Sequence, residues 1–264
     1  MKSNYLKILR EQSPLIHNIT NIVVANYVAN GLLSIGASPI MSDAIEEMNE
    51  LPAICQALVI NIGTLTAEQV KAMIKAGISA NKNNTPVVLD PVGVGATIFR
   101  QESVKTLLSE IKFDLIRGNA GEIAHLAQVN WNAKGVDAGS GNANLSQIAK
   151  DVAIKYNCIV SISGEIDYIS DGKKVAKIDN GTQLFPKITG SGCLLSAVCG
   201  AFLTLDENSF DLTVSACTSY AIAGQIAQEN LSDTQTGQFY IALLDSLAKI
   251  DDETVEQYAK VSFE

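Results

Sequence analysis

The chain has 264 residues, of which 47% are hydrophobic, and a formal net charge of −9. This length and apolar content suffice for one large domain with a buried core, or at most for two small ones; of these, we expect a single domain over residues 1–264. The net negative charge disfavours binding to the phosphate backbone of nucleic acids and to anionic lipid. We therefore expect neither a nucleic-acid nor a membrane partner.

The first third of the chain alternates between helical and extended patterns. Residues 22–33 are apolar and rich in Asn and Ala, which indicates a helix, and residues 38–41 form a short strand-like piece. Residues 45–51 resemble a surface helix. The continuous apolar run at residues 57–62 is typical of a strand covered on both faces. Thr66-Ala67-Glu68-Gln69 fits a capping box, so we predict that Thr66 begins the next helix.

The alternation continues through the rest of the chain. Residues 86–91 have the pattern of a buried strand that ends in a carboxylate, Asp90. Further extended segments are predicted at residues 115–116, 158–162 and, as an edge hairpin, 167–178. The Gly- and Asn-rich residues 131–144 are predicted to be a loop. The remaining predicted helices cover residues 103–111, 122–127, 146–156, 192–203, 212–229 and 238–249.

Helices that separate short apolar strands predict parallel βαβ units. The expected fold is therefore a layered α/β/α fold with a mostly parallel central sheet. Ligands bind such sheets beyond the carboxyl ends of the strands. Polar motifs cluster at those ends: Asn61-Ile62-Gly63-Thr64, Asp90-Pro91-Val92-Gly93-Val94-Gly95, Arg117-Gly118-Asn119 and Ser163-Gly164-Glu165.

The cysteines are five in number and no pair has C-x-x-C spacing, which argues against a disulfide framework or a zinc site. A reducing, cytoplasmic setting is the expectation. The first five residues lack the apolar segment of a secretory signal, so none is expected.

The most specific motif is Thr189-Gly190-Ser191-Gly192-Cys193, which precedes an apolar helical run. Glycines let backbone N–H groups converge on an oxyanion, and the positive end of the helix dipole lies at the same place. Such a site can hold a transferring phosphoryl group. The simpler alternative is a tight turn before a packed helix.

Cys193 lies at the start of that helix, where the dipole is expected to lower the pKa of its thiol. It would then act as a base for a substrate hydroxyl, or as a polar contact. The alternative is a buried structural thiol, which most cysteines are.

Two carboxylates follow predicted strands and are candidate Mg²⁺ ligands. Asp90 ends its strand just before a proline and two glycines, and Glu122 closes the sequence Asn119-Ala120-Gly121-Glu122. Mg²⁺ prefers oxygen ligands and keeps most of its waters, so one or two carboxylates suffice. Alternatively, Asp90 is a strand-end turn residue and Glu122 an acid favoured by the helix dipole.

Arg117 and Ser163 are candidate contacts for nucleotide phosphates. Arg117 offers the bidentate donors that suit phosphate, and Ser163 offers a hydroxyl at a strand end. The alternatives are a surface arginine and a turn serine. No Gly-x-x-x-x-Gly-Lys-Ser/Thr pattern occurs in the sequence, which excludes the P-loop class.

Taken together, the chain resembles the hydroxyethylthiazole kinases of the ribokinase-like superfamily nearly end to end. The similar blocks occur in the same order, and they include the replacement by Cys193 of the Asp that ribokinase relatives usually carry. The blocks are residues 14–21, 30–33, 36–41, 61–65, 90–97, 117–123, 134–137 and 190–193.

The resemblance implies a ribokinase-like fold and transfer of a phosphoryl group from ATP to the hydroxyl of 5-(2-hydroxyethyl)-4-methylthiazole in thiamine salvage. It further implies that Asn21, Met41 and Gly190 bind the thiazole. Cys193 would face the substrate hydroxyl, with Gly190 and Gly192 in the anion hole as the other catalytic groups.

For the nucleotide, the resemblance implies that Arg117 and Ser163 bind ATP phosphates and that Asp90 and Glu122 organise Mg²⁺. It also implies a homotrimer with sites at subunit interfaces. Family members often carry Thr where this chain has Ser163 and Ser191, and both changes keep the hydroxyl.

Three other functions remain open from the sequence. One is a kinase for another small alcohol, such as a pyrimidine, a pyridoxal-type compound or a sugar. Another is an ATP- or ADP-dependent dehydratase that repairs hydrated nicotinamide cofactor, although its usual Gly-x-Gly-Asp is absent here. The third is a non-catalytic nucleotide-binding or thiamine-precursor-binding module.

Overall fold

The computed structural model describes residues 4–129, 131–134, 137–140 and 144–264. Within them, nine strands form one sheet in the order β11–β10–β9–β8–β5–β4–β3–β1–β2. Six neighbouring strands are parallel: β2 (Ser38–Met41), β1 (Leu15–Ile19), β3 (Ala57–Asn61), β4 (Val87–Asp90), β5 (Leu115–Asn119) and β8 (Ile159–Ser163). The last three are antiparallel: β9 (Asp167–Ser170), β10 (Val175–Ile178) and β11 (Val261–Phe263).

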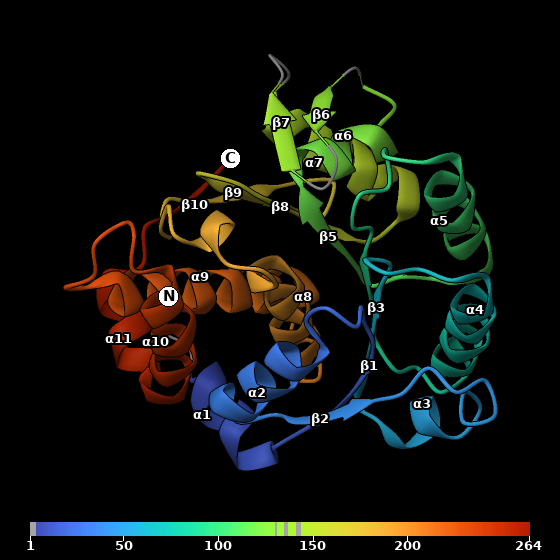
Figure 1. Ribbon diagram of the computed structural model, residues 1–264, viewed down its shortest axis with the longest axis horizontal. Helices are drawn as coiled ribbons and strands as arrows, with labels where there is room; N and C mark the ends of the chain where they lie inside the picture. The colour runs from blue at the N-terminus through green and yellow to red at the C-terminus, as the bar shows by residue number, and fades with distance from the viewer. Residues whose placement is uncertain (1–3, 130, 135–136, 141–143) are drawn as a thin grey trace.

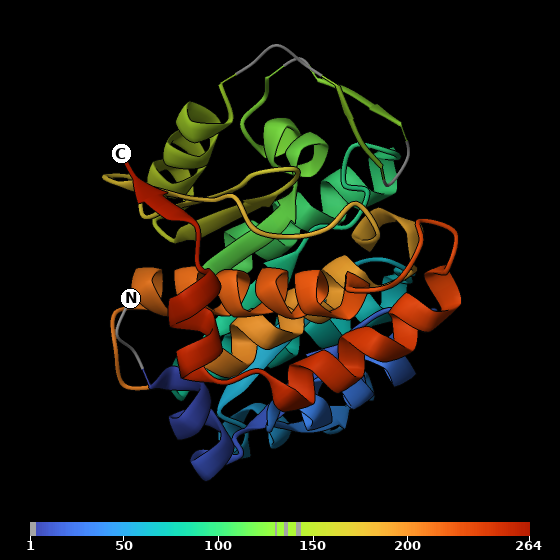
Figure 2. The ribbon, with the colours of Figure 1, turned by 90° about the vertical axis from the view of Figure 1, so that its left-hand side faces the viewer.

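Helices cover both faces of this sheet, as predicted for a layered α/β/α fold (Figure 1). One face is packed by α1 (Tyr5–Gln12), α2 (Ala25–Ile35), α8 (Ser191–Phe202), α9 (Ser209–Gln228), α10 (Thr236–Lys249) and α11 (Asp252–Tyr258). Figure 2 shows α9 and α10 crossing this face. The other face carries α3 (Leu51–Ile54), α4 (Ala67–Lys82), α5 (Ile98–Glu110), α6 (Ala120–Leu126) and α7 (Leu145–Tyr156). In the described part of the chain, every helix is too short or too polar to cross a bilayer.

The central strands are buried on both faces, which explains their continuous apolar sequences. Every residue of β3 is buried, and alternate side chains enter opposite cores. Val59 packs in the core beneath α8, whereas Leu58 and Ile60 pack in the core beneath α4. A Cβ on Gly200 of α8 would lie 2.7 Å from Val59 Cγ2, so α8 rests directly on the sheet.

A capping box fixes where α4 begins, whereas α2 begins without a side-chain cap. Thr66 Oγ1 accepts a hydrogen bond from Gln69 N, and Gln69 Oε1 accepts one from Thr66 N, so the predicted capping box is confirmed. Helix α2 starts at Ala25, three residues later than predicted. Ile22 and Val23 are therefore left outside the helix, with 79% and 67% of their surface exposed.

Several predictions were wrong in detail. Residues 45–50 form turns, and the short helix α3 follows them because Pro52 suits a first helical turn. The predicted loop at 131–144 contains the antiparallel strands β6 (Asn132–Lys134) and β7 (Asp137–Ser140), whose pairing uses backbone groups that composition does not reveal. Residues 135–136 and 141–143 of that region, and residue 130 just before it, lie outside the described residues.

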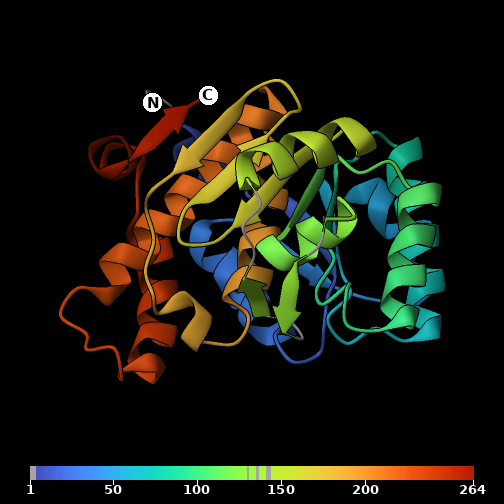
Figure 3. The same cartoon turned by 90° about the horizontal axis from the view of Figure 1, so that it is seen from above.

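The hairpin predicted at the sheet edge is present but is not the edge. The C-terminal strand β11 pairs with β10 and covers it, as Figure 3 shows from above. Strand β1 was not predicted at all, although it lies between β2 and β3. His17 and Asn18 interrupt its apolar pattern, and both are buried.

Candidate active site

Neighbouring parallel strands bring their polar carboxyl ends into one row. Asn61 at the end of β3 is paired with Asp90 at the end of β4. Asn119 at the end of β5 is paired with Ser163 at the end of β8. Arg117 belongs to β5 itself, not to a loop after a two-residue strand as predicted. The row confirms the expectation that motifs distant in the sequence meet at this edge.

The glycine-rich turn lies at the start of α8 and faces this row. Gly190 is the residue before the helix, and its φ of 92° lies in the left-handed region that favours glycine. A Cβ on Gly192 would lie 2.7 Å from Arg117 Nη1, so the absence of a side chain lets the helix start close over the guanidinium. The first amides of an α-helix have no partner within the helix. This helix start therefore brings N–H groups and a cation together.

Asp90 is a buried carboxylate held in one orientation. Its Oδ2 accepts hydrogen bonds from Asn61 Nδ2 at 2.7 Å and from Ser196 Oγ at 2.8 Å. Its Oδ1 is buried and has no hydrogen-bond partner among the described residues. Burial raises the pKa of Asp90, against the opposing charge of Arg117. The free oxygen leaves this carboxylate able to accept a cation or a proton.

Glu122 is fixed by backbone N–H groups from the loop after β4 and from the end of β5. Its Oε1 accepts from Gly93 N at 2.9 Å and its Oε2 accepts from Asn119 N at 2.7 Å. Asn119 Oδ1 in turn accepts from Glu122 N, which completes a capping box at the start of α6. Burial and the neighbouring charge of Asp90 raise the pKa of Glu122 to about 7. Glu122 thus caps α6 and also lies beside the strand ends that carry Asp90 and Asn119.

Arg117 is buried, with 7% of its surface exposed, and contacts Ser163 directly. Its Nε and Nη2 donate to Ser163 Oγ at 3.0 and 2.5 Å. Burial acts to lower the pKa of Arg117, but the charges of Asp90, Glu122 and Asp167 raise it. The two predicted phosphate ligands are therefore neighbours, beside the start of α8.

Cys193 points toward the same row, on the side of Asn21. Asn21 Nδ2 lies 3.4 Å from Cys193 Sγ and 3.0 Å from Asn61 Oδ1. The expectation that the helix start lowers the pKa of Cys193 is wrong. Burial, and next the charge of Asp90, raise this pKa to about 12. The thiol is therefore neutral near pH 7, which suits a polar contact better than a general base.

Met41 lies at the end of the row, on β2. It is paired with Asn18 of β1 and packs, partly buried, against the core that contains α8. The structure thus places Met41 on the face of the sheet that α8 covers, with β1 between its strand and β3.

Three residues at the site were given no role from the sequence. Asn61 was noted only as part of a strand-end motif, and its link between Asn21 and Asp90 depends on how β3 and β4 pair. Ser196 stands out only as a hydroxyl in an apolar helix. Asp167 begins β9 and is buried near Arg117, and no local pattern marks it.

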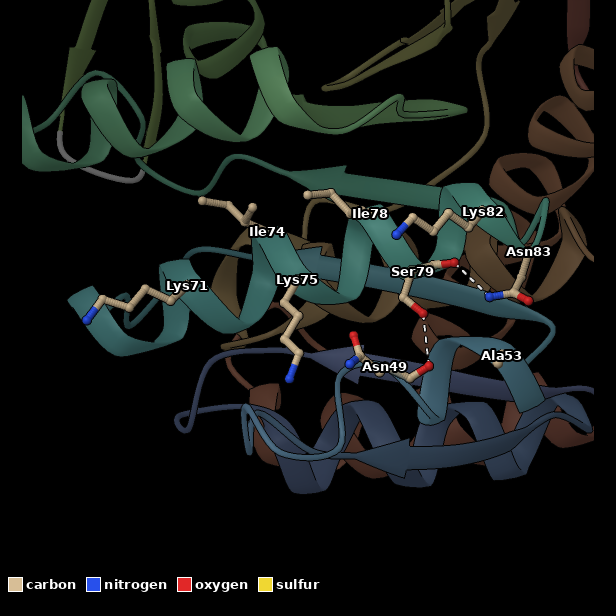
Figure 4. A pocket seen from close by; sticks show the side chains of 9 residues that line it. All are labelled: Asn49, Ala53, Lys71, Ile74, Lys75, Ile78, Ser79, Lys82 and Asn83. Carbon is tan, nitrogen blue, oxygen red and sulfur yellow. Dashed lines mark hydrogen bonds between the residues drawn. The ribbon is translucent and has the colours of Figure 1, made fainter.

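A separate groove lies between α4 and the segment that contains α3, with a volume of about 880 Å³ (Figure 4). Its lysines are partly engaged nearby, because Lys71 pairs with Glu68 and Lys75 donates to Ile45 O. Ser79 Oγ donates to Asn49 O across the groove. None of the strand-end residues lines it, so it is distinct from the candidate active site.

Comparison with known proteins gives one consistent family. Residues 6–253 match the model of the hydroxyethylthiazole kinase family. A hydroxyethylthiazole kinase from Pasteurella multocida is 62% identical, and the match covers 100% of both chains. One from Haemophilus influenzae is 57% identical, and the match covers 99% of both chains.

Solved structures agree with this result. A hydroxyethylthiazole kinase from Pyrococcus horikoshii OT3 superposes with a TM-score of 0.89 at 39% identity, covering 98% of this chain and 97% of that one. A pyridoxal kinase from Staphylococcus aureus, solved with AMP-PCP and pyridoxal, has a TM-score of 0.64 at 13% identity, covering 95% and 98% of the two chains. The second likeness shows a shared ribokinase-like fold only. The full-length matches to curated relatives show more: this chain belongs to the hydroxyethylthiazole kinase family.

Proposed function

We propose that the protein transfers the γ-phosphoryl group of ATP to the hydroxyl of 5-(2-hydroxyethyl)-4-methylthiazole, as in thiamine salvage. The observation that carries this proposal is the approach of the α8 start to Arg117, where a Cβ at position 192 would lie 2.7 Å from Nη1. Phosphoryl transfer needs positioning and stabilisation of charge that spreads over oxygen atoms. Helix amides and a buried guanidinium supply both. Residues 1–264 would act as one domain, because both cores share one sheet.

On the substrate side, the proposed contacts are Asn21, Met41 and Gly190. Asn21 is fixed by Asn61 and lies against Cys193, which the same hydrogen-bond network connects to Asp90. Cys193, Gly190 and Gly192 would be the catalytic groups around the substrate hydroxyl and the transferring phosphoryl group. Since the raised pKa keeps the Cys193 thiol neutral, its role would be to orient the hydroxyl. An alcohol that loses its proton late in the transfer needs little help from a base.

On the nucleotide side, the proposed phosphate ligands are Arg117 and Ser163. Both hydrogen bonds between them have Arg117 as the donor, so the hydroxyl proton of Ser163 stays available for a phosphate oxygen. The guanidinium also has Nη1 beneath the start of α8. Arg117 can therefore interact with phosphate and with the transferring group in turn.

We propose Mg²⁺ as the cation of this site, because Mg²⁺ keeps several of its waters and needs only one or two carboxylates. Asp90 has one buried oxygen without a partner among the described residues. Three carboxylates, Asp90, Glu122 and Asp167, are among the groups whose charge acts on Arg117, so these four side chains carry a net charge of minus two when all are ionised. Asp90 and Glu122 would hold the ion, directly or through water. When bound, Mg²⁺ neutralises the charge that develops on the phosphate oxygens.

A substrate panel tests this function. ADP formation is measured with the thiazole alcohol, a hydroxymethylpyrimidine, pyridoxal and ribose, and dehydration of hydrated NADH is measured separately. We expect kcat/KM for the thiazole to exceed the others by about 100-fold, the size of discrimination that binding contacts give. A higher kcat/KM for another alcohol, or dehydratase activity without kinase activity, would reject the proposal.

A variant pair ties the activity to this site. Arg117→Ala removes the buried guanidinium and should abolish measurable use of ATP. Arg10→Ala is the control, because among the described residues Arg10 donates to the carbonyls of Leu247 and Ala248, away from the row. Full activity of Arg117→Ala, or equal loss in both variants, would contradict the site.

We also propose that the protein works as a homotrimer with its sites at subunit interfaces. The support is the exposure of Ile22 and Val23 directly after Asn21, since apolar side chains at a site's rim favour burial by a neighbour. Ile22→Glu should then give monomers and lower activity together, measured by analytical ultracentrifugation. Ile154→Glu, at a similarly exposed position on α7, is the control. A monomeric, fully active wild type would exclude this assembly.

We propose the cytoplasm as the location of the protein. Its five free cysteines suit a reducing compartment.

A further inference from the structure

Asp167 lies at the closed end of the β8–β9 hairpin, directly across from a proposed phosphate ligand. The antiparallel register pairs Ile162 with Tyr168, so the next pair along the hairpin is Ser163 and Asp167. Opposite residues of an antiparallel pair point to the same face. The residue that carries the phosphate-binding hydroxyl and a carboxylate therefore share one face of the hairpin.

The carboxylate of Asp167 closes the loop between the two strands. Its Oδ1 accepts a hydrogen bond from Gly164 N at 2.9 Å. Gly164 itself is exposed, whereas Asp167 is 92% buried, with 8% of its surface accessible. Ser163 is thus fixed from two sides, by Arg117 at its hydroxyl and by the loop that Asp167 holds at its carbonyl side.

The charge of Asp167 also acts on Arg117. It is one of three carboxylates whose fields reach this guanidinium. The other two, Asp90 and Glu122, are the proposed Mg²⁺ ligands. Asp167 has no part in that pair, so it is the carboxylate left to balance Arg117 on the side of Ser163. A buried guanidinium needs such compensation because desolvation of a charge is costly.

We propose that Asp167 is a positioning residue for nucleotide binding, which holds the Ser163–Gly164 loop and aligns Arg117 without touching the nucleotide. The inference rests on the proposed function, because Arg117 and Ser163 bind the ATP phosphates there. Asp167 acts through these two residues and is not a catalytic group.

Three variants test the role. Asp167→Ala removes both the hydrogen bond and the charge, whereas Asp167→Asn keeps an oxygen that can accept from Gly164 N. Asp171→Asn is the matched control: Asp171 also accepts backbone N–H groups, from Lys173 and Lys174, at the turn that follows the same strand. KM values for ATP and for the thiazole are measured separately, together with melting temperature.

Asp167→Ala should raise KM for ATP about tenfold, as expected for the loss of a buried hydrogen bond, and leave KM for the thiazole within about twofold. Asp167→Asn should recover part of the loss, and Asp171→Asn should match the wild type. Unchanged KM for ATP in Asp167→Ala, or an equal rise of both KM values, would overturn the proposal.

Direct titration with a non-hydrolysable ATP analogue keeps the test decisive. If Asp167→Ala does not fold, Asp167→Asn must bind the analogue more weakly than the wild type by calorimetry, or the proposal fails. The calorimetry needs no phosphoryl acceptor. A wild type that binds the analogue but does not phosphorylate the thiazole would therefore refute the proposed substrate and leave the role of Asp167 testable.

Discussion

Asn61 Nδ2 donates a 2.7 Å hydrogen bond to Asp90 Oδ2, and this bond joins the metal side of the site to the substrate side. The same amide accepts from Asn21 and from Gly63 N through its Oδ1. With both ends used, the amide has only one orientation that satisfies its partners. Asn61 and Ser196 both donate to Oδ2 of Asp90, so together they leave its Oδ1 as the free oxygen within the described part of the chain.

Asn61→Asp should be among the most damaging single changes at the site. It places a second carboxylate against buried Asp90, where like charges raise each other's pKa and bind a proton instead of a cation. We expect kcat to fall by about 100-fold or more, the usual cost of a disordered catalytic geometry. Steady-state kinetics with varied Mg²⁺ measures this.

Asn144→Asp is the control for that charge change. Asn144 caps α7 by accepting from Gln147 N, and an aspartate makes an equally good cap. Its activity should match the wild type. If Asn61→Asp keeps wild-type kcat and Mg²⁺ dependence, the bridging role of Asn61 is wrong.

Gly192→Ala should impair turnover by moving Arg117. The added Cβ would lie 2.7 Å from Nη1 and 3.3 Å from Nη2, and the buried guanidinium would have to shift. We expect a fall in kcat/KM for ATP of about 100-fold, because displacements near 1 Å have that effect. In Gly237→Ala, the control, the new Cβ meets no atom within 4 Å. That variant should be fully active and slightly more stable. Equal kinetics of the two variants would contradict the close approach of α8 to Arg117.

Cys193→Ser tests whether the thiol acts as a base. Because burial raises the pKa of Cys193 to about 12, thiolate is scarce at neutral pH. A serine hydroxyl can still accept from Asn21, so kcat should stay within about tenfold, less than the loss typical for removal of a general base. The pH–rate profile from pH 6 to 9 should keep its shape. A loss of several thousandfold, with a changed profile, would restore the base role.

Much of the architecture was predictable because it depends on local patterns. The strand at β3 is continuously apolar, and Thr66 and Gln69 sit at capping-box spacing, so both features are encoded within a few residues. The site row was predictable for a related reason. Parallel strands align their carboxyl ends, so Asp90 and Asn119 must approach each other whatever the details of the loops.

What could not be predicted depends on pairing across the sheet. Strand β1 contains His17 and Asn18, whose burial becomes clear only once β2 and β3 flank it. From the sequence, Asp167 is only a polar residue at the start of a predicted hairpin. Its charge raises the pKa of Arg117 because strand β8 lies between β5 and β9 in the sheet. The raised pKa of Cys193 could not be predicted either, because it depends on burial and on the charge of Asp90, which comes from a distant part of the chain.

The burial of Asp167 should make stability fall as pH rises. Burial raises the pKa of its carboxyl from 3.8 to about 6, so the folded state holds the proton more tightly than the unfolded state. Its stabilising contribution is complete below pH 3.8 and is lost as pH rises through about 6. Between pH 5 and 8, the free energy of unfolding of the wild type should fall by roughly 1 kcal/mol more than that of Asp167→Asn.

Urea denaturation at the two pH values, without metal ions, measures this difference. Comparing two variants at each pH cancels the titration of other groups to first order. Asp171→Asn is again the control, because backbone hydrogen bonds lower the pKa of Asp171, so this carboxyl is ionised throughout the range in both states. Its free energy of unfolding should follow the wild type with pH. A pH dependence that is the same in the wild type and in Asp167→Asn would mean that the Asp167 carboxylate is not held in the buried environment beside Arg117.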